Sequence, residues 1–401
     1  MPLPSVETVD LPFTTVETPR GPLHVRTHRL GLSHRTGRAP VSYARHASPE
    51  LLALLALDPL LAACDPRGAL FLDTETTGLS GGTGTVAFLV GLAFWDGGSE
   101  PALVLEQLLV RALGEEAPML ERLRERIEAA SMLVTFNGKS FDMPLLRTRF
   151  VMTRSSPPAE PPHLDLLHIA RRVHGKRTGR GFRLVALERD VLGFERVDDV
   201  PSSEIGAVYM HFLRTGEAGA LLGVIEHNAW DVVAMAALLG LYGEPEHGSL
   251  AAGDLVGVAR TLRRAGSLER AMAVADAAVD RDSTPESLRA RADIAKARGD
   301  RKRALADFET LAATVDDASV RLELAKLYEH WLRSPAGALR WAERGTGESA
   351  DSHHRRTERL TRKAKLASHP AATNDASSTS SAASMSALPT TRAGATRRTF
   401  P

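Results

Sequence analysis

The sequence is organised around the run Ala69-Leu70-Phe71-Leu72-Asp73-Thr74-Glu75-Thr76-Thr77-Gly78. Its first four residues are apolar, which is typical of a buried strand. In a strand, residues i and i+2 point to the same face, so Asp73 and Glu75 are expected to project together from the strand end. Two ionised carboxylates there are costly unless they are paired or bind a metal ion. For this pair alone, a strand-end turn with solvated acids explains the pattern equally well.

Strand and helix patterns alternate around this run over residues 67–243. Two further strands are expected directly after it, over 86–95 and 102–110. The later elements are, in order, a helix over about 115–130, a strand over 132–136, a helix from about 140, a short strand near 164–169, and helices near 183–193, 203–214 and 217–240. Three strands followed by alternating helix and strand predict an α/β domain, with a mixed sheet flanked by helices in the ribonuclease-H-like order.

Residues 1–66 read as an N-terminal extension, with two strand fragments around a Pro/Gly turn in 16–25 and a short helix over 51–61. Residues 350–401 are predicted to be a basic, largely disordered tail. From residue 352 onward this tail has nine Lys or Arg and two Asp or Glu, a net charge of +7. Because the whole chain carries +1, the remainder carries −6. A solubilising tail or a nonspecific contact with nucleic acid would both fit this charge.

Residues 252–349 are rich in Ala and Leu and carry no strand signal. Similar residues recur there at spacings of 33 and 34, at Leu255, Leu288 and Leu322, at Ala271, Ala304 and Ala338, and at Met272, Leu305 and Leu339. Gly266 and Gly299 are expected to mark turns between paired helices. The period resembles that of tetratricopeptide repeats, whose unit is about 34 residues, although unrelated helical hairpins can produce it. The prediction is an all-α helical-repeat domain.

The composition is that of a soluble protein. Its one cysteine, Cys64, cannot form an internal disulfide, which favours a reducing compartment. The N-terminal residues 1–13 lack a basic-then-apolar signal pattern. The most apolar stretch, 51–64, is broken by Asp58-Pro59 and is shorter than the ~20 residues of a membrane span. We expect a cytoplasmic protein that does not contact a membrane.

Two further acids stand where elements are expected to begin. Asp142 lies in Asn137-Gly-Lys-Ser-Phe-Asp-Met-Pro-Leu-Leu146, which follows a predicted strand and opens a helix, so its carboxylate could simply stabilise the helix dipole. The segment Gly138-Lys139-Ser140 is not a phosphate loop, because Leu133 stands where that motif requires glycine. His227 and Asp231 are four residues apart at the start of a helical pattern and therefore share one helix face.

Taken in order, Asp-x-Glu-Thr-Thr-Gly, Asn-x-x-x-Phe-Asp-x-Pro-Leu-Leu and His-x-x-x-Asp resemble the three exonuclease motifs of the DEDD superfamily. Within it, the chain is similar to the YprB-like, ribonuclease-H-like family. The supporting stretches are Phe136 to Asp142, Ile225 to Val233, and Asp198-Asp199-Val200-Pro201 with Tyr209. The resemblance covers about residues 67–243.

This resemblance implies that Asp73, Glu75, Asp142 and Asp231 converge on two divalent cations, Mg²⁺ or Mn²⁺, with Asp73 as the bridging ligand. It also makes His227 the candidate general base, since an imidazole titrates near neutrality. DEDD enzymes with a catalytic histidine usually place it five residues before the aspartate, and those with tyrosine four. His227 has the tyrosine spacing, so a structural or metal-orienting role is the alternative.

Several polar residues are candidates for contact with a nucleic-acid strand. A segment without Asp or Glu runs from 166 to 187 and contains clustered Arg and Lys among glycines, and it is expected to be a basic loop that holds phosphates, or a solvated charge run. The candidates are Thr76, Asn137, Lys139, Lys176, Arg177 and Arg180. The Gly-rich stretch 78–85 reads as a hairpin loop. Asp165, Asp198 and Asp199 are assigned to capping and turns.

The function expected from these residues is metal-dependent hydrolysis of phosphodiester bonds in DNA or RNA, as a 3′–5′ exonuclease with a helical domain that binds a protein partner. The alternatives are an inactive, nuclease-like scaffold that recruits partners through the helical repeats, and a nucleic-acid-binding protein without turnover. Aromatic residues make up 5% of the chain, which disfavours a platform for stacking single-stranded bases.

Overall fold

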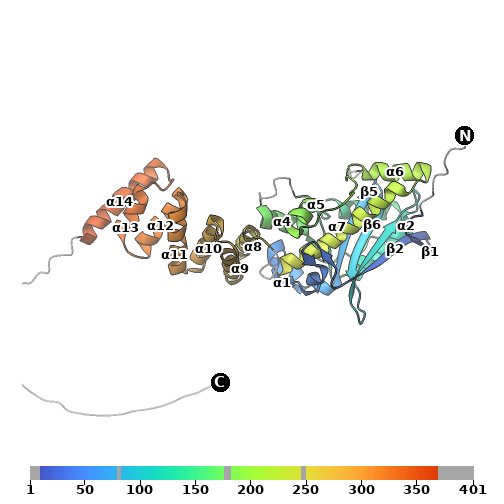
Figure 1. The fold of residues 1–401 in the computed structure, drawn as a ribbon, viewed down its shortest axis with the longest axis horizontal. Coiled ribbons are helices and arrows are strands. Elements are labelled where there is room, and N and C mark those ends of the chain that lie inside the picture. The colour runs from blue at the N-terminus through green and yellow to red at the C-terminus, as the bar shows by residue number, and fades with distance from the viewer. Residues whose placement is uncertain (1–9, 79–82, 176–181, 245–249, 369–401) are drawn as a thin grey trace, which may run out of the picture.

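The computed structural model describes residues 10–78, 83–175, 182–244 and 250–368. Figure 1 shows an α/β domain from which a row of helices extends to one side. The α/β domain contains the site discussed below. The expected fold class, a mixed sheet with helices followed by an all-α region, is confirmed.

The domain is built on a seven-stranded sheet in the order β1-β2-β7-β6-β5-β8-β9. Its interior strand β5 is antiparallel to β6 and parallel to β8, as expected for a mixed sheet. The strands are β1 (Thr14–Thr18), β2 (Gly21–Gly31), β5 (Ala69–Thr76), β6 (Ala87–Trp95), β7 (Ala102–Leu109), β8 (Met132–Thr135) and β9 (His163–Asp165). A separate hairpin joins β3 (Arg35–Thr36) and β4 (Ala39–Pro40).

The N-terminal segment is part of this sheet, not an extension that ends at residue 66. Strand β2 pairs with β7 along its length, and β1 then pairs with β2. Otherwise the edge groups of β7 would lack partners in the sheet. The segment continues through η1 (Val41–His46) and α1 (Pro49–Ala56), which both pack on helix α7 (Gly219–Gly243), and then through η2 (Pro59–Ala63) and η3 (Pro66–Gly68).

Alternation along β5 separates two apolar clusters. Phe71 belongs to the cluster that includes most of α7, whereas Leu72 belongs to the cluster formed with α2 (Glu116–Glu128) and α3 (Asp142–Met152). Asp73 and Glu75 share the parity of Phe71, so their side chains leave the strand on the face that α7 covers. Helix α6 (Ile205–Thr215) contributes Tyr209, which stacks on Phe88 with ring centroids 3.9 Å apart.

Helix α7 is the long apolar helix of the domain. By length and composition it could span a membrane, but 72% of its most apolar 18-residue window is buried inside the protein. It contacts β5, β6 and β7. Its apolar sequence is therefore that of a core helix wedged between the sheet and the N-terminal segment.

The segment after β8 differs from expectation. The short strand expected near 164–169 ends at Asp165, because the Asp165 side chain accepts the backbone N–H of Leu167 and caps α4 (Leu166–His174). Arg171 and Arg172 therefore lie on a helix and not in a basic loop. Helix α5 (Leu184–Leu187) and the π-helical turn η5 (Glu188–Leu192) follow.

The helical region begins with α8, which packs closely against α4. A Cβ added at Gly257 would lie 1.8 Å from the Val173 carbonyl oxygen, so only glycine permits this contact. Beside it, buried His174 bonds to Asp254 and to Tyr242 through its two ring nitrogens. The helices are α8 (Ala252–Arg264), α9 (Leu268–Arg281), α10 (Pro285–Arg298), α11 (Arg301–Thr314), α12 (Ala318–His330), α13 (Pro335–Glu343) and α14 (Ala350–Ser368).

The helices pack in pairs, and the expected turns at Gly266 and Gly299 are present with φ of +81° and +83°. The prediction of a largely disordered tail from residue 350 is wrong for residues 350–368, because Ala350–Ser368 is helix α14. Leu360 anchors α14 on α13, and Arg359 and Lys363 bond to the buried carboxylate of Glu329. The Ser- and Thr-rich part of the predicted tail, 369–401, lies outside the described residues.

Candidate metal centre

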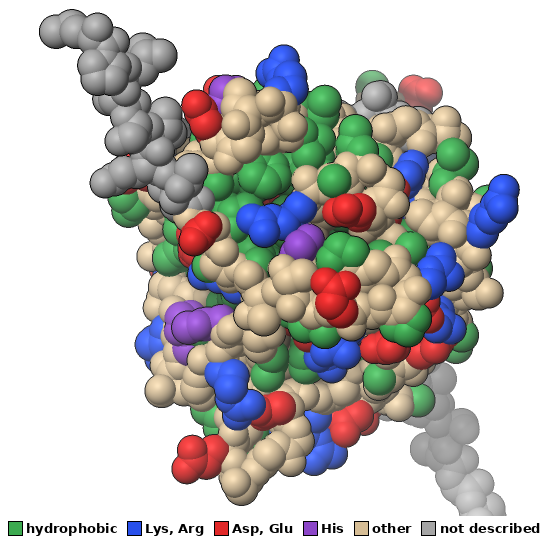
Figure 2. All heavy atoms as spheres, turned by 90° about the vertical axis from the view of Figure 1, so that its right-hand side faces the viewer, with side chains coloured by type: hydrophobic (Ala, Val, Ile, Leu, Met, Phe, Trp, Pro, Cys, Tyr) green, Lys and Arg blue, Asp and Glu red, His purple; other side chains and the backbone are tan. Residues whose placement is uncertain are grey.

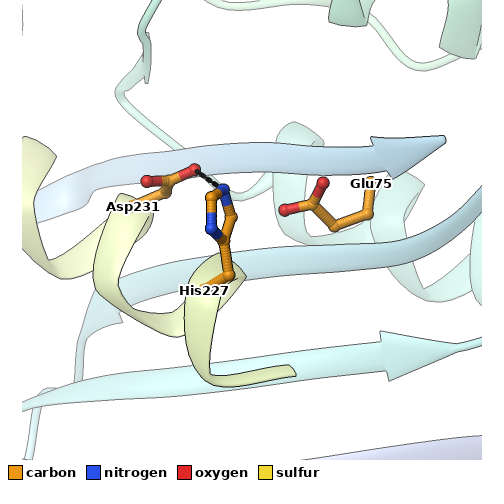
Figure 3. Close-up of side chains that lie close together, drawn as sticks. All are labelled: Glu75, His227 and Asp231. Carbon is orange, nitrogen blue, oxygen red and sulfur yellow. Dashed lines mark ion pairs between the residues drawn. The ribbon is translucent and has the colours of Figure 1, made fainter. Parts of the chain in front are cut away.

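Strand β5 and helix α7 bring three potential metal ligands together. Glu75 extends from β5, and His227 and Asp231 stand one turn apart on α7 (Figure 3). One ligand atom from each of the three lies within 4.8 Å of the others, and His227 Nε2 is 3.6 Å from Asp231 Oδ2. The four-residue spacing in α7 thus directs both side chains to one point, as the sequence predicts.

Asp73 is held beside this group by a buried amide network. Asn228 Nδ2 donates to Asp73 Oδ2 at 3.0 Å, and Asn228 Oδ1 accepts from Gln107 Nε2 at 3.0 Å. Asn228 and Gln107 are fully buried. The network crosses β6 at Gly91, the register partner of both Asp73 and Gln107. A Cβ at Gly91 would lie 2.2 Å from Asn228 Oδ1, so glycine is required there.

Asp142, the first residue of α3, lies close enough to Asp73 and Glu75 to affect their pKa values. Its Oδ1 accepts a hydrogen bond of 2.5 Å from Thr74 Oγ1. The loop before it is shaped by Asp165, whose carboxylate accepts the backbone N–H of Asn137 at 2.8 Å and of Lys139 at 3.2 Å. Asn137 has φ of +69°. Asp165, assigned to capping by sequence, therefore also fixes the turn that presents Asp142.

Arg196 is a buried cation in the centre that sequence reasoning missed. It forms two hydrogen bonds of 2.6 Å with Glu188 and contacts Asp231 Oδ1. The Arg196 side chain is 2% exposed and that of Glu188 is fully buried. Burial lowers the pKa of Arg196, but the hydrogen bonds to Glu188 and the charge of Asp231 outweigh it and raise the pKa overall. No local pattern marks Arg196, because its partners lie on other elements.

Asp199, which the sequence predicts to be a turn residue, contacts the imidazole of His227. Its Oδ1 is 2.6 Å from His227 Nδ1, and its Oδ2 is 3.5 Å from Arg196 Nη1. The preceding Asp198 has φ of +54°, which belongs to this turn. His227 Nε2 then faces the acids, while Nδ1 faces Asp199. Asp199 therefore orients the imidazole.

The acids of the centre repel one another in a largely water-free setting. Burial, and then the charges of Asp231, Glu75 and Asp142, raise the pKa of Asp73 well above its usual value. Burial and the charges of Asp231 and Asp142 do the same to Glu75. Burial raises the pKa of Asp142 to about 6, against the opposing hydrogen bond from Thr74.

The donor set fits a divalent cation. Within the described part of the chain, Glu75 Oε1 is buried and has no hydrogen-bond partner. A buried carboxylate oxygen without a partner is costly, and hard divalent cations prefer oxygen ligands. Asp73 and Asp142 lie close enough to interact electrostatically with Glu75, but each is hydrogen-bonded to a neutral side chain.

The raised pKa values predict how the metal-free protein responds to pH. A carboxyl group whose pKa rises on folding favours the folded state most below its unfolded pKa, and this advantage is lost as pH rises through the folded value. For Asp142, whose pKa rises from 3.8 to about 6, the loss corresponds to about 3 kcal/mol. We expect the free energy of unfolding, measured with denaturant and chelator, to fall as the pH rises from about 4 through about 6 for Asp142, and to fall further up to pH 8 as Asp73 and Glu75 ionise.

The control for this prediction is Asp142→Asn, which removes one of the three titrating groups and should reduce the fall, most of all below about pH 6. Mn²⁺ or Mg²⁺ should restore stability at pH 8 more than at pH 5, because metal ligands must be deprotonated. If the metal-free protein gained stability as the pH rises to 8, that result would contradict the proposed repulsion among the acids.

Three of the six predicted nucleic-acid contacts, Thr76, Asn137 and Lys139, lie among the described residues. Thr76 is buried and donates to the Gly78 carbonyl oxygen at 2.9 Å, so its hydroxyl is already engaged. The Lys139 side chain is 37% exposed and its Nζ is 4.0 Å from Asp58. Asn137 shapes the turn before Asp142. Three candidates, Lys176, Arg177 and Arg180, lie outside the described residues.

Figure 2 shows the face of the α/β domain that is remote from the helical region. Basic and acidic side chains are interspersed there, and those of the described residues form no continuous basic surface on this face. This side of the domain therefore lacks the charge pattern of a nucleic-acid-binding surface.

Comparison with known proteins agrees with this geometry. The family model of the RNase_H superfamily matches residues 70–242, which span β5 to α7 and include all the acids of the centre. The chain is also 28% identical over 353 residues to a protein of Bacillus subtilis (strain 168) named "Uncharacterized protein YprB". That similarity covers 84% of this chain and 83% of the relative.

Proposed function

We propose, from the premise that residues 70–242 form an RNase H superfamily domain, that this chain is a metal-dependent nuclease of the DEDD type. The observation that carries the proposal is the group of Glu75, His227 and Asp231, to which Asp73 and Asp142 lie close enough to add their charges. One buried oxygen of Glu75 has no hydrogen-bond partner among the described residues. Such a concentration of negative charge is costly for the fold and is explained if the acids bind cations.

The four acids, with His227 beside them, would hold two divalent cations, Mg²⁺ or Mn²⁺. Divalent cations supply charge stabilisation at phosphodiester oxygens and activation of water. The protein's own residues orient the ligands: Asn228 fixes Asp73, Thr74 fixes Asp142, and Arg196 fixes Asp231. His227 Nε2 faces the same point, which suits either acceptance of a proton or ligation of a cation.

We propose DNA or RNA as the substrate and 3′–5′ removal of nucleotides as the reaction, on the strength of the three motifs in order. The test is to incubate the full chain with single- and double-stranded DNA and RNA, labelled at the 5′ end, with Mg²⁺, Mn²⁺ or chelator. We expect ladders of shortened, 5′-labelled products that require the metal. Failure to cleave any of these substrates with either metal would refute the proposal.

A second role, recruitment of a protein partner, is favoured by the paired helices α8 to α14 and their 33- and 34-residue period. We propose that they act as tetratricopeptide-like repeats. An inactive scaffold would use these helices alone. It predicts equal, background cleavage with metal and with chelator, which the same assay distinguishes.

A further inference from the structure

The hydrogen bond to Asp199 determines which nitrogen of His227 is available. Asp199 Oδ1 lies 2.6 Å from Nδ1, and an ionised carboxylate can only accept a hydrogen bond. Nδ1 therefore carries a hydrogen. Arg196 Nη1 is 3.3 Å from the same nitrogen, but it is a donor and finds its acceptor in Asp199 as well. In the neutral imidazole, the lone pair is then on Nε2.

That lone pair points at carboxylate oxygens. Nε2 is 3.6 Å from Asp231 Oδ2. One ring nitrogen of His227 and one oxygen each of Glu75 and Asp231 lie within 4.8 Å of one another, and Nε2 is the nitrogen that Asp199 leaves available. Atoms that share one cation at about 2.1 Å lie at most about 4.2 Å apart, so small side-chain movements complete the set. The Glu75 oxygen, the Asp231 oxygen and the lone pair of His227 Nε2 are all acceptors, so they cannot hydrogen-bond to one another. All three can bind the same cation.

The other contacts of Asp231 and Glu75 leave an oxygen of each residue available for a cation. Arg196 contacts Asp231 through Oδ1, which leaves Oδ2 on the side of Nε2. Glu75 has a buried oxygen, Oε1, without a hydrogen-bond partner among the described residues. In metal sites, the imidazole nitrogen that does not bind the metal usually donates a hydrogen bond to a carboxylate, a backbone carbonyl or water. Asp199 is such a carboxylate for His227 Nδ1.

We propose that His227 is a ligand of the cation held by Glu75 and Asp231, that Asp199 is its positioning residue, and that the nitrogen ligand makes this centre prefer Mn²⁺ to Mg²⁺. Mg²⁺ binds oxygen and gives up water reluctantly, whereas imidazole suits transition metals better. The inference deepens the proposed function and rests on it for the presence of the cation. It gives His227 a role other than the general base that the motifs imply.

The test is pulsed electron paramagnetic resonance of Mn²⁺ bound to the full chain, in which a coordinated imidazole nitrogen modulates the electron spin echo. Wild-type protein should show this nitrogen coupling and His227→Gln should lose it. Calorimetric titration should show Mn²⁺ affinity reduced by about 10-fold or more in His227→Gln, with a smaller change for Mg²⁺. His211→Gln, which alters an exposed histidine on α6, should match wild type in both measurements.

Asp199 is tested by the same readouts. Asp199→Ala should lower Mn²⁺ affinity by about 10- to 100-fold, as loss of a residue that orients a metal ligand does. Asp199→Asn keeps an acceptor for Nδ1 and should retain most of the affinity. Bound Mn²⁺ without nitrogen coupling, or coupling that survives His227→Gln, would overturn the inference. The proposed nuclease activity would survive that result, because it is measured separately by cleavage.

Discussion

Replacement of Asp73 by asparagine is expected to reduce metal-dependent cleavage by about 1,000-fold or more. The substitution preserves the shape of the side chain but removes the charge that the proposed cations require. Loss of charge stabilisation by metal is worth several kcal/mol in a transition state, and each 1.36 kcal/mol is tenfold in rate. The effect should appear at every Mg²⁺ and Mn²⁺ concentration that wild-type protein uses.

The fold should survive this change and even gain from it. Burial and three neighbouring carboxylates raise the pKa of Asp73, so a neutral side chain relieves repulsion in the metal-free protein. We therefore expect Asp73→Asn to have a higher melting temperature than wild type in chelator at pH 8. The control is Asp280→Asn, an exposed acid on α9. Cleavage that persists in Asp73→Asn would show that the measured activity does not come from this centre.

Replacement of Gly91 by alanine is expected to damage both the fold and the candidate site. The new Cβ would lie 2.2 Å from Asn228 Oδ1 and 2.8 Å from its Cγ. Asn228 is a fully buried residue of α7 that is bonded to both Asp73 and Gln107, so its side chain cannot move aside without losing these bonds. Overpacking of this kind costs about 1–3 kcal/mol, and the displaced amide would also release Asp73 from its position.

The measurement for this prediction is denaturant unfolding together with cleavage. The matched control is Gly97→Ala, where an added Cβ meets nothing within 4 Å. Adding Asn228→Ala to Gly91→Ala should recover part of the stability by making room for the methyl group, but not the activity. Equal stability of Gly91→Ala and Gly97→Ala would mean that the amide network does not pack as described.

Local sequence patterns were sufficient for most elements of the α/β domain. The apolar run 69–72 and its neighbours predicted β5 to β8, and apolar spacing predicted the helix that became α7. The exceptions are informative. Strand β9 is shorter than expected because Asp165 caps a helix where apolar residues continue, and apolar runs suit strand and helix equally. The place of β1 and β2 in the sheet depends on β7, about 80 residues away.

The residues of the candidate site divide in the same way. The sequence by itself determined that Asp73 and Glu75 share one face of a strand and that His227 and Asp231 share one face of a helix, because these relations follow from local periodicity. Only the tertiary structure decided what surrounds them. Gln107 bonds to Asn228 across 121 residues of sequence, and Arg196 binds Asp231. The reason is that a buried polar group needs a hydrogen-bond partner, and the packing of elements that are distant in the sequence determines which residue that partner is.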